Sequence, residues 1–91
     1  MPPNLFVAEE FLALEWVNVT SSNLLRVAYT PDAMRLWVEF IRKPGSNSKY
    51  HVYYYDNVPD AVWDHLLIAP SKGTFFDAHV KKALYPYQPY Q

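Results

Sequence analysis

The residues of this 91-residue chain with the clearest capacity for chemistry form one aromatic cluster: Tyr50, His51, Tyr53, Tyr54 and Tyr55. Tyrosine rings on a sheet can stack against nucleic-acid bases, and each stacked ring contributes ~1–3 kcal/mol to binding. The same rings also favour strands and fill hydrophobic cores. The cluster therefore predicts either a binding surface or a densely packed strand, and the sequence leaves both interpretations open.

The choice between the two interpretations depends on whether the sheet face with these rings is covered or exposed. Two helices expected later in the chain would cover one face, so the other face stays open unless the N-terminal segment packs over it. If that face is open, Trp37, Tyr53, Tyr55 and Arg26 form an exposed aromatic and basic platform. On this interpretation Trp37, Tyr53 and Tyr55 are the candidates for stacking against a ligand.

A second candidate site is Ser71-Lys72-Gly73-Thr74, which lies at the start of an expected helix. Free N–H groups and a lysine at a helix start can converge on a phosphate. The segment lacks the spacing of a Walker loop, and a helix cap with glycine in the turn explains it more simply. We retain all four residues as phosphate-binding candidates. If the aromatic platform and this loop lie close together, a nucleotide would satisfy both, with its base on tyrosine and its phosphate on the helix start.

The other groups of polar residues give weaker evidence for a metal site or a catalytic site. The three histidines, His51, His65 and His79, have no partners at metal-ligand spacing, and the chain has no cysteine. Asp60 and Asp64 lie one helical turn apart, but acids at a helix N-terminus are explained by the helix dipole. No nucleophile-elbow sequence supports a hydrolase. We therefore expect a non-enzymatic protein with no catalytic residues, no metal and no cofactor.

Composition bounds the class of protein. The chain is 51% hydrophobic and 19% charged, which is typical of a globular domain. It contains no apolar run of the ~20 residues that a membrane span requires. Its first residues lack the basic and apolar regions of a signal peptide. These features predict one small cytoplasmic domain, with no membrane partner.

Charge limits the class of ligand. The formal net charge is −1, which argues against binding through many phosphate contacts. Residues 1–15 contain three acids and no base, whereas the bases cluster later in the chain, around residues 42–49 and 72–82. A small nucleotide or a short single strand is therefore a more plausible ligand than a duplex.

The elements that must position these residues can be located from prolines and from hydrophobic alternation. We predict strands over Trp16–Thr20, Leu24–Thr30, Arg35–Arg42 and Lys49–Tyr55, joined by short turns into an antiparallel meander. In the third of these, alternate residues face inward, which places Trp37 outward.

The remaining segments have helical or extended character. Pro59 predicts the start of a helix that stops at Pro70, and a Thr-x-x-Asp pair at Thr74 and Asp77 predicts a second helix to about Leu84. Residues 4–15 permit a short helix, and residues 85–91 read as extended. The fold class is therefore α+β: a three- to four-stranded antiparallel meander with two C-terminal helices packed on one face.

The order of the motifs resembles that of a known family. The blocks are, in chain order, Val19-x-Ser21-Ser22-Asn23-Leu24, Tyr29, Leu36-x-Val38-x-Phe40, Tyr53-x-Tyr55-x-x-Val58-Pro59 and Ala69-x-Ser71-x-Gly73-x-x-Phe76. They resemble the KTSC domain, named for a segment at the C-terminus of some lysyl-tRNA synthetases and also found as a stand-alone small protein. The resemblance spans residues 16–87 and leaves residues 1–15 as an N-terminal extension and residues 88–91 as an extended tail. The loop at residues 43–49 is longer than is usual for the family.

The resemblance implies an RNA-binding role and supplies no catalytic residues. Together with the aromatic cluster, it favours a small binding module for RNA or a nucleotide-type ligand. The alternative is a protein-interaction or self-associating module, an inhibitor or adaptor, that buries the same aromatic surface against a protein partner or a second copy. Salt separates the two, because nucleic-acid affinity falls steeply with ionic strength and an apolar interface responds little.

Overall fold

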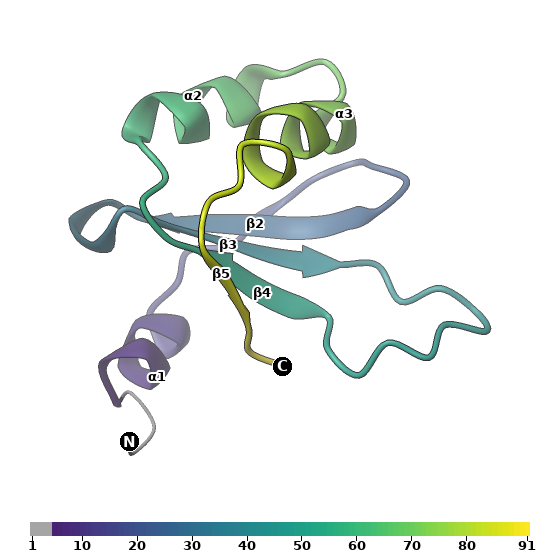
Figure 1. The fold of residues 1–91 in the computed structure, drawn as a ribbon, viewed down its shortest axis with the longest axis horizontal. Coiled ribbons are helices and arrows are strands. Elements are labelled where there is room, and N and C mark those ends of the chain that lie inside the picture. Colours follow the sequence, from purple (N-terminus) through teal and green to yellow (C-terminus); the bar gives the residue numbers. More distant parts are fainter. Residues whose placement is uncertain (1–4) are drawn as a thin grey trace.

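Five antiparallel strands form one open sheet, and helices cover both of its faces (Figure 1). The structure is a computed structural model that describes residues 5–91. The strands are β1 Val17–Asn18, β2 Leu24–Thr30, β3 Arg35–Phe40, β4 Val52–Tyr55 and β5 Tyr87–Pro89. The helices are α1 Leu5–Leu12, α2 Asp60–Ile68 and α3 Lys72–Phe76, with a 3₁₀ turn η1 at Pro31–Ala33 and a π-helical turn η2 at Asp77–Lys81.

The sheet is a simple meander with spatial order β1-β2-β3-β4-β5, so each strand pairs with its neighbours in the chain. The predicted α+β class and meander are confirmed, as are the two C-terminal helices on one face. The predicted strand count of three to four was too low. The tail was expected only to be extended; within it β5 pairs with β4 and adds a fifth strand.

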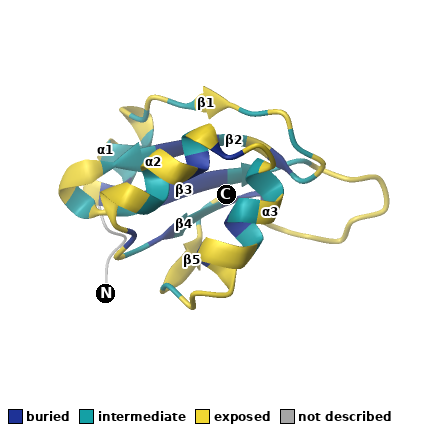
Figure 2. Cartoon of the chain, turned by 90° about the horizontal axis from the view of Figure 1, so that it is seen from above, coloured by how far each residue is buried: buried dark blue, intermediate teal, exposed yellow. Residues whose placement is uncertain are grey.

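Alternation along the central strands sends side chains to two separate cores. Leu36 and Val38 of β3 point toward α2 and α3, where they pack with Leu66 and Phe76. Trp37 points to the opposite face and belongs to the smaller core beneath α1. Strands β2 to β4 are consequently the most buried part of the molecule (Figure 2).

The register of β4 against β3 divides the tyrosine cluster between the two faces. Tyr55 lies opposite Leu36 and Tyr53 opposite Val38, so both point toward the C-terminal helices. Tyr54 lies opposite Trp37 and points toward α1, with the two ring centroids 4.9 Å apart. The cluster therefore supplies both faces of the sheet, as expected for a strand that is covered twice.

Helix α1 covers the face that the sequence left undecided. Val7 and Phe11 of α1 pack on Trp37, which is 0% exposed. The predicted exposed platform is therefore wrong on two counts: Trp37 is buried, and it lies on the opposite face from Tyr53 and Tyr55. The physical reason is that an N-terminal helix with apolar residues spaced for one face removes the aromatic side chains of that face from water.

The C-terminal helical region differs in detail from its prediction. Ser71 caps α3, where its Oγ accepts a hydrogen bond from the N–H of Thr74 at 3.3 Å, so the predicted cap at Thr74 was wrong by three residues. The α-helix ends at Phe76 and continues as the π-helical η2. None of the helices within residues 5–91 is long and apolar enough to cross a membrane.

Candidate functional site

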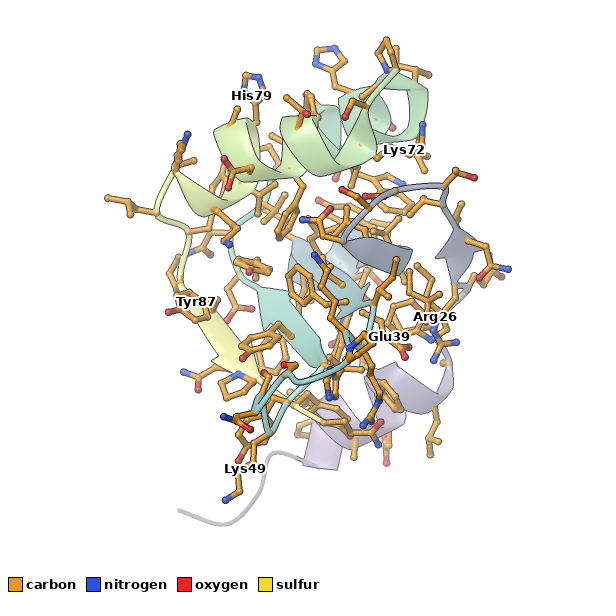
Figure 3. All side chains as sticks on the ribbon, turned by 90° about the vertical axis from the view of Figure 1, so that its right-hand side faces the viewer. Arg26, Glu39, Lys49, Lys72, His79 and Tyr87 are labelled. Carbon is orange, nitrogen blue, oxygen red and sulfur yellow. The ribbon has the colours of Figure 1, made fainter. Side chains whose placement is uncertain are left out.

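A cleft of about 930 Å³ lies between the β3–β4 loop and the segment that leads from η2 into β5. We call it the tyrosine cleft. Its lining residues are Asn23, Phe40, Ile41, Lys43, Ser46, Ser48, Tyr50, His51, Tyr53, Tyr55, Lys81, Leu84, Tyr85, Pro86 and Tyr87. Figure 3 looks onto this end of the molecule, with Tyr87 on β5 and Lys49 on the loop.

Three of the five tyrosines that line the tyrosine cleft, Tyr53, Tyr55 and Tyr87, lie next to one another. The pairing of β4 with β5 brings Tyr87 beside the other two, with ring centroids 6.3 Å from Tyr53 and 5.6 Å from Tyr55. Phe40 supports Tyr53 at 5.7 Å, edge to face. Tyr55 is only 5% exposed and Tyr87 is 60% exposed, so the rings range from the buried floor to the open rim.

The hydroxyl of Tyr55 remains protonated in the folded protein. Burial raises the pKa of Tyr55 to about 12, and the neighbouring Tyr87 and Tyr53 add to the shift. A neutral phenol can both donate and accept a hydrogen bond. The floor of the tyrosine cleft therefore offers a hydrogen-bonding group within an aromatic surface.

The tyrosine cleft contains basic residues and no acidic ones. Apart from Asn23, all of its lining belongs to residues 40–55 or 78–91, and neither stretch contains an aspartate or a glutamate. Lys43 enters from the loop wall and Lys81 from η2 on the facing wall. An acid-free hollow with cations on two walls favours an anionic ligand over a cationic one.

The ion pairs show which cations of the described chain already have a partner and which do not. Arg26, Arg35 and Lys82 each pair with a carboxylate. Lys72 donates to the carbonyl of Ala69 at 2.8 Å. Within residues 5–91, the cations without any ion pair or hydrogen bond from the side chain are Arg42, Lys43, Lys49 and Lys81. Lys43 and Lys81 line the tyrosine cleft, and Arg42 and Lys49 belong to the β3–β4 loop that forms one of its walls.

The wall of the tyrosine cleft that contains Lys81 and Leu84 has an irregular backbone. The N–H of Lys82 donates to the carbonyl of Asp77 at 3.1 Å, the five-residue spacing of a π-helix. Leu84 follows in the left-handed region with a φ of 61°, which is strained for a branched side chain. π-helical turns and strained residues occur often at functional sites. Here they bring Lys81 and Leu84 to the tyrosine cleft.

The predicted phosphate loop lies outside the tyrosine cleft. None of Ser71, Lys72, Gly73 and Thr74 lines it, so the condition for a joint base and phosphate site, that this loop belongs to the same hollow as the tyrosines, is not met. Ser71 is occupied as the cap of α3, and Lys72 folds back onto the end of α2. The loop therefore has a packing role. A helix start can be recognised from the sequence, but the sequence does not show which of its free N–H groups a capping side chain will satisfy.

Gly73 is explained by close approach to another turn. A Cβ at this position would lie 2.5 Å from Oδ1 of Asn23 and 2.9 Å from Oγ of Ser21. Ser21 in turn accepts hydrogen bonds from the N–H groups of Asn23 and Leu24, both at 3.2 Å. The Ser-Ser-Asn and Ser-x-Gly motifs therefore meet in space and fasten the β1–β2 turn to α3.

Of the other predicted site residues, Tyr53 and Tyr55 lie in the tyrosine cleft and Trp37 does not. Arg26 pairs with Glu39 at 2.6 Å and covers the ring of Trp16 at 4.1 Å, away from the cleft. Four further residues of the cleft were not among those predicted from the sequence: Phe40, Lys43, Lys81 and Tyr87. The sequence feature that could have indicated them is that residues 40–55 and residues 78–91 both lack acids and are both rich in tyrosine.

No metal site accompanies the tyrosine cleft. Within residues 5–91 no group of three or more His, Asp or Glu side chains is placed to hold an ion. A smaller hollow of about 640 Å³ lies between α1 and η1 and is acidic, with Glu9, Glu10, Glu15 and Asp32 in its lining. The two hollows thus carry opposite charge.

Comparison with known proteins places the chain in a family. A search of curated proteins found no match. A crystal structure of a KTSC domain protein from Yersinia pestis aligns with a TM-score of 0.70 and 29% sequence identity, covering 87% of this chain and 100% of that one. The sequence model of the KTSC domain matches residues 20–85, which include β2 to β4, α2, α3 and both stretches that line the tyrosine cleft up to Tyr85. The chain therefore belongs to the KTSC domain family.

Proposed function

We propose that this KTSC domain is a non-enzymatic binding module whose tyrosine cleft takes RNA or a nucleotide-type ligand. The observation that carries the proposal is the position of two unpaired lysines, Lys43 and Lys81, in a cleft that is lined by tyrosine rings and by no acid. RNA-binding modules recognise single strands by stacking bases on aromatic side chains and by holding phosphates with lysine or arginine. The tyrosine cleft supplies both kinds of group within one hollow.

Each part of such a ligand has a counterpart among the lining residues. A base would stack on the accessible ring of Tyr87 or on the partly exposed ring of Tyr53. Phosphates would approach Lys43 and Lys81 from the two walls. The neutral hydroxyl of Tyr55 and the side chain of Asn23 offer hydrogen bonds to a base edge or a sugar.

The size of the tyrosine cleft agrees with this class of ligand. Its volume of about 930 Å³ is near the upper end of the range for small-ligand pockets, ~300–1,000 Å³. A hollow of this size holds one or a few unstacked nucleotides, whereas a duplex would need a broader basic surface. The net charge of −1 also disfavours a duplex, which is held by many phosphate contacts.

A second candidate function is a protein-interaction or self-associating module that uses the same surface. The observation in its favour is the exposure of apolar side chains at the rim, with Leu84 84% exposed beside Tyr87. Tyrosine is also enriched among the residues that dominate protein interfaces. Such a complex would weaken little with added salt, in contrast to a complex with RNA.

The test is an equilibrium titration of the protein with a short fluorescent single-stranded RNA. Lys81→Ala is compared with Lys82→Ala, because the two lysines are adjacent but only Lys81 lines the tyrosine cleft. We expect Lys81→Ala to weaken binding by about 1 kcal/mol and Lys82→Ala to change it by less than half of that. Equal effects of the two variants, or the absence of binding to the wild-type protein, would refute the proposal.

A further inference from the structure

We infer that the ligand is a single-stranded oligonucleotide whose backbone crosses the tyrosine cleft from the β3–β4 loop to η2, rather than a free mononucleotide. The inference rests on the proposed function and specifies its ligand. Three features of the described residues carry it: the spread of unpaired charge, the number of ring positions, and the absence of a free helix start near the cleft.

The first feature is that positive charge extends beyond the tyrosine cleft. Lys43 and Lys81 line it, whereas Arg42 and Lys49 lie on the same loop but outside the lining. All four are free of ion pairs within residues 5–91. A single terminal phosphate inside the hollow would leave Arg42 and Lys49 without an anionic partner, whereas a strand that continues along the loop would bring further phosphates toward them.

The second feature is that the rings offer more than one position for a base. Tyr53 and Tyr87 lie side by side, with their planes inclined by 50°. Tyr50 stands on the loop wall and is 40% exposed. Rings on two walls can stack successive, splayed bases of one strand, which is the usual arrangement in proteins that bind single strands.

The third feature is that, among residues 5–91, no free helix start lies at the tyrosine cleft to hold a terminal phosphate. Ser71 already caps the start of α3, away from the tyrosine cleft. The turn η2 continues directly from α3, so it presents no free N–H groups of its own to a ligand. Recognition must therefore depend on separate lysine and arginine contacts along a backbone, and the affinity should rise with the number of phosphates.

These features predict a particular response to salt. For single strands the logarithm of the affinity falls by about 0.7 per contacted phosphate for each unit in the logarithm of salt concentration. Four unpaired cations therefore predict a slope of about −2 to −3 for an oligonucleotide. Replacing Lys49 by alanine should reduce the slope by about 0.7 to 1, although Lys49 lies outside the hollow.

The experiment compares adenosine monophosphate with an oligoadenylate of about six nucleotides, by calorimetry and by fluorescence anisotropy at several salt concentrations. We expect the oligoadenylate to bind at least about tenfold more tightly, and Lys49→Ala to weaken only its binding. Lys82→Ala is the matched control, because Lys82 is similarly exposed but pairs with Asp77 at 3.3 Å. Circular dichroism confirms that each variant is folded.

The outcomes separate this inference from the proposed function. If adenosine monophosphate binds as tightly as the oligoadenylate, the inference is overturned and the proposed function stands. If neither binds, both are overturned. Equal affinity for the corresponding deoxyribose oligomer supports the inference and assigns recognition to backbone charge and bases, whereas preference for the ribose oligomer supports it and adds the 2′-hydroxyl.

Discussion

At the scale of single residues, Glu10 holds the N-terminal helix on the sheet. Its carboxylate accepts hydrogen bonds from Trp37 Nε1 at 2.6 Å, from Arg35 Nη1 at 2.6 Å and from Thr30 Oγ1 at 2.8 Å. All of these groups except Glu10 belong to β2 and β3. One side chain of α1 therefore satisfies the indole N–H of the most buried tryptophan in the described chain.

We predict that Glu10→Gln lowers the free energy of unfolding by about 1.5–3 kcal/mol, because it removes a charge-assisted hydrogen bond in a mostly buried site. Denaturant titration measures the change. Glu9→Gln is the control, since Glu9 is exposed on the same helix and should change stability by less than ~0.5 kcal/mol. Equal losses in the two variants would contradict the assignment of Glu10 as the anchor.

Gly73 provides a second test of the fold. Gly73→Ala should destabilise the protein by about 1–3 kcal/mol, because the new Cβ would lie 2.5 Å from Oδ1 of Asn23. The loss should shrink when Asn23 is also replaced by alanine, since the closest clashing atom is then absent. Thermal or denaturant unfolding of the double-mutant cycle measures both effects. An additive cycle would show that the two residues are not in contact.

Tyr55 predicts a loss of stability at alkaline pH. Burial raises its pKa in the folded state to about 12, from an ordinary value of 10.0. The unfolded chain therefore ionises first, so the stability contributed by the neutral phenol is complete below about pH 10 and is lost as the pH rises toward 12. Tyr55→Phe should make the fall of unfolding free energy over this interval smaller. An unchanged fall would contradict the burial of the hydroxyl.

At the scale of elements, the β3–β4 loop is separate from the core. Residues 42–50 are all exposed, and Gly45 adopts a positive φ of 78° with open space around it (Figure 2). The loop nevertheless contributes Lys43, Ser46, Ser48 and Tyr50 to the tyrosine cleft. A long exposed loop that lines a hollow is better explained by ligand contact than by stability.

Deleting residues 44–48 should therefore separate stability from binding. The closure entropy of a loop changes by only ~0.6 kcal/mol for a twofold change in length, so the unfolding free energy should change little. Affinity for a single-stranded oligonucleotide should fall at least about tenfold, because one wall of the tyrosine cleft is lost. Denaturant unfolding and RNA titration on the same variant measure the two effects. Unchanged affinity would contradict the role of the loop.

Much of the element order could be predicted from sequence, because alternation and proline are local signals. The inward direction of Leu36 and Val38 is confirmed, as is the helix that begins after Pro59. The role of residues 5–12 could not be decided locally, since the cover of a sheet face depends on a tertiary contact. That one contact changed Trp37 from an exposed candidate into a core residue.

The candidate site was predicted only in part for the same reason. The predicted candidates Tyr53 and Tyr55 both line the tyrosine cleft, because both lie on one face of a single strand. Tyr87 and Lys81 lie about thirty residues further along the chain, and only the pairing of β5 with β4 brings that segment to them. A strand of three residues with a proline in it carries almost no local signal.

At the scale of the whole molecule, the small net charge conceals a strong separation of charge. The hollow between α1 and η1 is lined by four acids, and the tyrosine cleft is lined by lysines and no acid. A polyanion is attracted to one hollow and repelled from the other. If the proposed function holds, this separation of charge would orient the bound nucleic acid even though the formal charge is −1.

The edges of the sheet bear on the alternative of self-association. The outer strand β1 has two residues, and β5 has three and ends at Pro89. Short edges and proline leave few backbone groups for pairing with another sheet. Self-association would therefore have to use side chains such as Leu84, and Leu84→Ser should then reduce dimerisation measured by sedimentation. A monomer at all concentrations would remove this alternative.

The most direct test of whether the tyrosine cleft is the binding site is nuclear magnetic resonance. The isotope-labelled protein is titrated with an oligoadenylate. We predict that amide shifts concentrate in residues 40–55 and 78–91, with the largest changes near Tyr53, Lys81 and Tyr87. Gly73 and the acidic residues of α1 should be unaffected. Shifts centred on residues 71–74 or on α1, or no shifts at all, would contradict the account.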